Sequence, residues 1–154
     1  MKRPFMIQEH LKIASELCPV RDYLVSLYTA VLSRYPANSA IARQTRESVR
    51  SIRALISELD NLVFRDCPQI PDKAMDIYFG YFGGNQPFDE GRAKQLAGEL
   101  SSQAEMSALV GGDPFKAVEE HLVEAFEKYD VATIKRAFEL FSNEVFIYDC
   151  KRTE

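Results

Sequence analysis

Apolar residues recur at steps of three and four from Ile7 to Tyr148, and the apolar–polar alternation that marks a half-buried strand is absent. Steps of three and four place side chains on one face of an α-helix. Glycine, proline and helix-capping residues divide the pattern into segments. The expected helices span residues 6–17, 19–35, 39–64, 72–82, 89–110, 114–129 and 131–148. The sequence therefore predicts an all-α bundle of six or seven helices with mixed or orthogonal packing.

The helix boundaries rest on residues with known positional preferences. Cys18-Pro19 is expected to end the first helix, with Pro19 in the first turn of the second, because proline suits that position. Asn38 or Ser39 is expected to cap the helix 39–64, since such side chains accept hydrogen bonds from the free N–H groups of a first turn. The other expected N-caps are Asp89, Asp113 and Asp130.

Length and composition fit one globular domain over residues 1–154. Of the 154 residues, 46% are hydrophobic and 27% charged, and a chain of this size buries about 70% of its unfolded surface. No apolar stretch approaches the roughly 20 residues of a membrane span, and charged residues interrupt any secretory leader. The three cysteines are odd in number and form no C-x-x-C pair, which indicates a reducing compartment. We therefore expect a cytoplasmic protein that does not bind a membrane.

Residues that carry catalysis or hold metals are sparse. The only histidines are His10 and His121, and neither belongs to the paired motifs of zinc or di-iron sites. Nucleophile-elbow, P-loop and dinucleotide-binding motifs are absent. The sequence thus predicts no catalytic residue, no metal and no cofactor. A metal- or haem-binding protein, or an enzyme built from scattered residues, is an alternative, since Cys18 and Cys67 each precede a proline, as in haem-responsive Cys-Pro sites.

Charge is unevenly distributed along the chain. Residues 1–65 carry ten Lys and Arg against six Asp and Glu, residues 66–154 carry nine against seventeen, and the formal net charge is −4. Eight of the ten N-terminal cations are arginines, whose planar guanidinium suits carboxylate or phosphate groups better than lysine does. The split indicates an electrostatic partner, an internal pairing of the two halves, or no functional role.

Four arginines of the helix 39–64 form the main predicted partner-binding site. They are Arg43, Arg46, Arg50 and Arg53. Steps of three, four and three place them within an arc of roughly 80° that is expected to face solvent, away from the apolar stripe. Only Glu47 is close enough along the helix to offset their mutual repulsion. The row predicts a protein partner with an acidic surface, and a plain solvated face is the alternative.

A row of opposite charge is expected on the solvent face of the helix 114–129. It consists of Glu120, Glu124 and Glu127. These carboxylates offer an internal counterpart to the arginines, so pairing of the two rows across the bundle is a competing explanation of the charge pattern.

Aromatic residues cluster around the short helix expected over 72–82. They cannot all point one way, so some are expected to be exposed, to cover a loop or to meet a partner. The residues predicted as a secondary partner-binding site are Tyr78, Tyr81 and Phe82. A role in the core or in covering a neighbouring loop is the alternative.

These observations together predict a small cytoplasmic helical protein–protein interaction module without a catalytic centre, acting as a regulator, adaptor, inhibitor or assembly factor. The prediction rests on the missing catalytic motifs and on the opposed charge patterns. A nucleic-acid-binding regulator that uses the Arg-bearing helix 39–64 is an alternative, opposed by the net charge of −4 and by the length of that helix. Formation of a homo-oligomer is left open.

Overall fold

The computed structural model describes residues 3–70, 77–79 and 88–149, with side chains up to Asn143, and these ranges contain five α-helices and no strand. The helices are α1 (Ile7–Leu32), α2 (Ala40–Asp66), α3 (Glu90–Leu109), α4 (Pro114–Lys128) and α5 (Val131–Asp149). The all-α prediction is confirmed. The predicted number of six or seven helices is higher than the five found in the described residues.

The predicted break at Pro19 is wrong, because α1 continues through it. A proline inside a helix removes the hydrogen bond to the carbonyl four residues earlier, here that of Ser15. Pro19 is exposed, so water has access to this part of the helix. On the buried face, Leu11, Ala14 and Cys18 all belong to the core. Beyond the proline, the partly buried Leu24 also packs against the core. This packing outweighs the lost hydrogen bond, since tertiary packing supplies most of the stability of a helix.

The helix expected over residues 72–82 falls mostly outside the described residues. Within it the structure describes only residues 77–79, which form a turn. Tyr81 and Phe82 also lie outside the described residues, so Tyr78 is the one predicted aromatic contact that the structure places.

The other helix starts follow the capping residues predicted from the sequence. The Ser39 hydroxyl accepts a hydrogen bond at 3.3 Å from the backbone N–H three residues later, and α2 begins directly after it. The Asp89 carboxylate accepts the equivalent bond at 3.0 Å at the start of α3. Asp113 and Asp130 accept hydrogen bonds from the first turns of α4 and α5. These N-cap predictions are confirmed.

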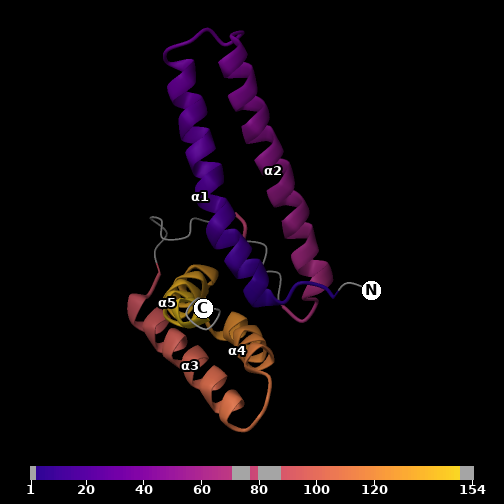
Figure 1. Ribbon diagram of the computed structural model, residues 1–154, viewed down its shortest axis with the longest axis vertical. Helices are drawn as coiled ribbons and strands as arrows, with labels where there is room; N and C mark the ends of the chain where they lie inside the picture. The colour runs from indigo at the N-terminus through magenta and orange to yellow at the C-terminus, as the bar shows by residue number, and fades with distance from the viewer. Residues whose placement is uncertain (1–2, 71–76, 80–87, 150–154) are drawn as a thin grey trace.

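α1 and α2 form a long antiparallel hairpin, and much of it stands away from the rest of the molecule (Figure 1). The buried apolar core includes α1 residues only as far as Cys18 and α2 residues only from Ile52 onward. Beyond these points α1 alone extends by about 20 Å, at 1.5 Å per residue. Val31 and Val49 are buried there without belonging to the core. We call residues 20–53 the distal hairpin, which touches the core at Ile52 and at the partly buried Leu24.

The core lies at the base of the hairpin. There α3 packs against α4 and α5, α4 and α5 also pack against α1, and α2 makes its extensive contacts with α1. In Figure 1 α5 is seen nearly end-on, whereas α1 and α2 lie close to the plane of the picture. The antiparallel pair α1 and α2 is therefore combined with a helix that crosses it steeply. Buried side chains such as Leu11, Leu100, Phe126 and Phe138 join four helices in one core, from which the distal hairpin projects.

Candidate interaction surface

The buried stripe of α2 leaves the four predicted arginines on one side of the hairpin. The stripe in this region consists of Ala42, Thr45, Val49, Ile52 and Ile56. At 100° per residue, the centre of the arginine row lies roughly 100° around the helix from the centre of this stripe. All four arginines are exposed, so they occupy a flank beside the buried stripe rather than the side opposite to it. We call Arg43, Arg46, Arg50 and Arg53 the arginine flank.

Little in the chain neutralises the arginine flank. Arg50 Nη1 lies 3.5 Å from Glu47 Oε1, and both side chains are more than half exposed. Water screens such a pair, so it contributes little to stability. Within the described part of the chain, no ion pair is formed by Arg43, Arg46 or Arg53. Three guanidinium groups are therefore open to a partner.

The glutamates of α4 do not provide the internal counterpart. In the described residues Glu120 lies 3.9 Å from Lys116 of its own helix, and neither Glu124 nor Glu127 forms an ion pair. α4 packs at the base of the molecule, whereas the arginines stand on the distal hairpin (Figure 1). Pairing of the two rows across the bundle is therefore wrong, because the fold holds them apart.

The distal hairpin as a whole is basic. Residues 20–53 contain six arginines, no lysine and two acidic residues. One of these acids, Asp22, has its Oδ1 2.8 Å from Arg21 Nη2, and the other is Glu47. Because the whole chain has a net charge of −4, the excess of acids lies in the rest of the molecule. Because the positive charge is gathered on the distal hairpin, an anionic surface is attracted to this part of the molecule rather than to the rest.

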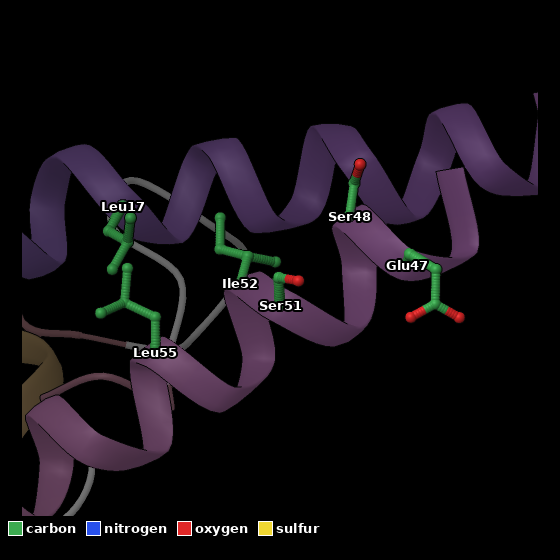
Figure 2. Close-up of a pocket in the computed structure, with 6 residues that line it drawn as sticks. All are labelled: Leu17, Glu47, Ser48, Ser51, Ile52 and Leu55. Carbon is green, nitrogen blue, oxygen red and sulfur yellow. The ribbon is translucent and has the colours of Figure 1, made fainter. Parts of the chain in front are cut away.

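The other flank of the hairpin carries a groove of mixed apolar and polar lining, which was not identified from the sequence. An open groove of about 500 Å³ lies there, lined by Leu17, Glu47, Ser48, Ser51, Ile52 and Leu55. Figure 2 shows Leu17 of α1 and Leu55 of α2 pointing toward each other, while the Glu47 carboxylate points away from α1. α1 also exposes Val20 and Tyr23, by 47% and 67%. The available signal was Leu55, which lies at the edge of the apolar stripe of α2 and is 49% exposed.

Tyr78, predicted as a partner contact, lies in the core. Its side chain is fully buried, and its hydroxyl lies 2.9 Å from Nδ1 of His10, which is fully buried as well. On the other side of the ring, His10 Nε2 lies 3.7 Å from Oδ2 of Asp66. The same carboxylate oxygen accepts a hydrogen bond from the backbone N–H of Phe5 at 3.3 Å. These contacts tie the N-terminal segment, the end of α2 and residues 77–79 to α1, so Tyr78 has a structural role.

Burial lowers the pKa of His10 from its ordinary value of 6.5, and the carboxylates of Asp66 and Glu9 oppose this shift without cancelling it. The unfolded chain then binds the proton more tightly than the folded protein, so stability is lost as the pH falls below about 6.5. We expect the urea midpoint of the wild type to fall between about pH 7 and pH 5, and to fall less in His10→Gln. His121→Gln, which changes a partly exposed histidine on α4, is the control. An equal fall in His10→Gln and the wild type would contradict the prediction.

The thiols of the two Cys-Pro dipeptides are not presented at the surface. Cys18 and Cys67 are buried, and their sulfurs lie 3.4 Å and 3.6 Å from the backbone carbonyl oxygens of Tyr78 and Phe5. Burial raises the pKa of Cys67 to about 11 and also raises that of Cys18, so both stay protonated near neutral pH. Such thiols are poor nucleophiles and poor metal ligands. No group of three or more His, Cys, Asp or Glu side chains in the described ranges is arranged to hold a metal ion.

The predicted site residues thus have different positions in the structure. The four arginines share one exposed flank of a projecting hairpin, whereas Tyr78 is enclosed in the core. None of the described helices is both long and apolar enough to cross a membrane. Comparisons with protein-family models, with curated proteins and with solved structures found no match.

Proposed function

We propose that the protein is a small cytoplasmic interaction module, acting as a regulator, adaptor, inhibitor or assembly factor, that binds an acidic protein surface through the arginine flank. One observation carries this proposal. Three of the four arginines, on the most projecting part of the molecule, form no ion pair within the described residues.

The helix makes the arginine flank a defined binding site rather than a diffuse charge. α2 is buried along one side against α1, so the four Cα positions keep a fixed spacing over about 15 Å of helix. Neighbouring arginines at this spacing repel one another by a few tenths of a kcal/mol per pair. Carboxylates of a partner relieve this repulsion and accept paired hydrogen bonds from the guanidinium forks. Binding of an acidic surface therefore stabilises an arrangement that is unfavourable in isolation.

The cytoplasmic part of the proposal rests on the cysteines. Cys18 and Cys67 are both free thiols, which is typical of proteins that work in a reducing compartment.

The test uses a fluorescent glutamate-rich peptide as the acidic probe and measures its affinity by anisotropy at low salt. We expect Arg46→Glu, Arg50→Glu to weaken binding about tenfold or more, because opposite charges become like charges at the contact. The variant should unfold at the wild-type temperature, since both side chains face water. The wild-type affinity should fall as salt rises.

A matched control reverses two cations elsewhere. Arg92→Glu, Lys94→Glu changes the net charge by the same amount on α3, where both side chains are more than 60% exposed. We expect this control to bind the peptide within about threefold of the wild type. Equal affinity of the control and the Arg46, Arg50 variant would overturn the proposal. Tighter binding of a short DNA duplex than of the peptide would favour the nucleic-acid alternative instead.

A further inference from the structure

Two rows of opposite charge on this protein have the same spacing. Steps of four and then three residues separate the members of each row, which are Arg46, Arg50 and Arg53 on α2 and Glu120, Glu124 and Glu127 on α4. Each row therefore extends about 10 Å along its helix. At 100° per residue the glutamates fall within an arc of roughly 60°, so they form one face as the arginines do. All six side chains are exposed.

The fold prevents these rows from meeting within one chain. The arginines stand on the distal hairpin, and α4 packs at the base against α1, α3 and α5 (Figure 1). Among the described residues, the members of the two rows have ion pairs only with neighbours on their own helices, at 3.5 Å for Arg50 and 3.9 Å for Glu120. Both of these pairs are largely exposed and contribute little. Each row is thus left with most of its charge uncompensated.

We propose that the acidic surface bound by the arginine flank is α4 of a second copy of this chain. The inference rests on the proposed function and specifies its partner. Alignment of α2 of one copy with α4 of the other in the same direction places Arg46, Arg50 and Arg53 at the levels of Glu120, Glu124 and Glu127, because the steps are identical. Three guanidinium–carboxylate contacts then form together.

The cations of α4 are offset from the arginines in this alignment and do not lie directly opposite them. Lys116 precedes the glutamate row by four residues and Lys128 follows it by one. In the same register they lie at the levels of Ala42 and Ala54, each one residue from an arginine, so two offset like-charge approaches stand against three matched arginine–glutamate contacts. Charge and spacing therefore both fit the contact.

The contact joins two different surfaces, and each copy carries one of each. Two copies can form it twice and close a dimer, in which the second contact is intramolecular and reinforces the first. If a copy instead uses its two surfaces on two different neighbours, the copies join head to tail into an open chain. In either assembly the arginine flank and α4 are occupied together.

The test is a charge-swap experiment followed by light scattering after size-exclusion chromatography. We expect the wild type to have more than the monomer mass at low salt and the monomer mass at high salt. Two variants, Arg46→Glu, Arg50→Glu and Glu120→Lys, Glu124→Lys, reverse the charges that face each other in this register, and each should be monomeric at low salt. A mixture of the two should regain the wild-type mass, because each reversed row meets its complement on the other variant.

The outcomes separate this inference from the proposed function. The wild type could be monomeric at every salt concentration and still bind the glutamate-rich peptide through the arginine flank. That result would overturn the inference that the partner is a second copy, and it would leave the proposed function in place. Association that survives in either variant, or a mixture that stays monomeric, also overturns the inference. If the lysine variant does not fold, Glu120→Gln, Glu124→Gln provides a milder second variant, which should lower the associated fraction.

Discussion

Phe138→Ala is expected to lower the free energy of unfolding by about 3–5 kcal/mol, the range for large-to-small changes of an aromatic residue in a core. Phe138 is only 2% exposed and lies 6.1 Å, centroid to centroid, from the ring of Phe141. It belongs to the core that joins α5 to α1, α3 and α4. Removal of the ring leaves a cavity in the core to which all five described helices contribute, and the loss appears as a lower urea midpoint.

The exposed ring of Phe115 provides the comparison for this prediction. Phe115 is 57% exposed at the start of α4, so Phe115→Ala should change the free energy of unfolding by only about 0.5 kcal/mol. Similar midpoints for Phe138→Ala and the wild type would show that α5 is peripheral to the folded unit.

Tyr78→Ala is expected to destabilise the protein by about 3–5 kcal/mol, because it removes a fully buried aromatic ring. The hydroxyl contributes a separate part of this effect. Tyr78→Phe keeps the ring and leaves His10 Nδ1 without its 2.9 Å partner. A buried polar atom left unsatisfied in this way costs about 1–3 kcal/mol. Chemical denaturation of both variants separates the contribution of the ring from that of the hydrogen bond.

The stability of Tyr78→Ala also distinguishes the core position of Tyr78 from the partner contact predicted for it. A surface contact would leave the stability of Tyr78→Ala unchanged and reduce only partner binding. Wild-type stability of Tyr78→Ala would therefore contradict the position described above.

The helix starts could be predicted because each depends on a side chain next to the helix it begins. Ser39, Asp89 and Asp113 accept hydrogen bonds from the following turn, and no distant contact is needed. Pro19 is different. The same proline is compatible with the first turn of a new helix and with an exposed position inside a continuous one, and the burial of Cys18 beside it distinguishes the two. That burial depends on residues far away in the chain.

The candidate site shows the same division between local and distant causes. Helical periodicity alone places Arg43, Arg46, Arg50 and Arg53 on one face. Their position on a projecting hairpin depends on where the core ends along α1 and α2, and periodicity contains no information about that. Tyr78 could not be placed for a related reason, since an aromatic residue beside a turn can be buried or exposed and its partner, His10, is 68 residues away.

The central claim is that the arginine flank binds an acidic surface. The most direct test is a nuclear magnetic resonance titration of the wild-type protein with the glutamate-rich peptide, which shows where the probe binds without any substitution. The account predicts that the shifts of backbone amide and arginine side-chain N–H signals concentrate on α2 between residues 43 and 53 and diminish as salt is added. Shifts concentrated on α3, or spread evenly over the cations of the molecule, would contradict it.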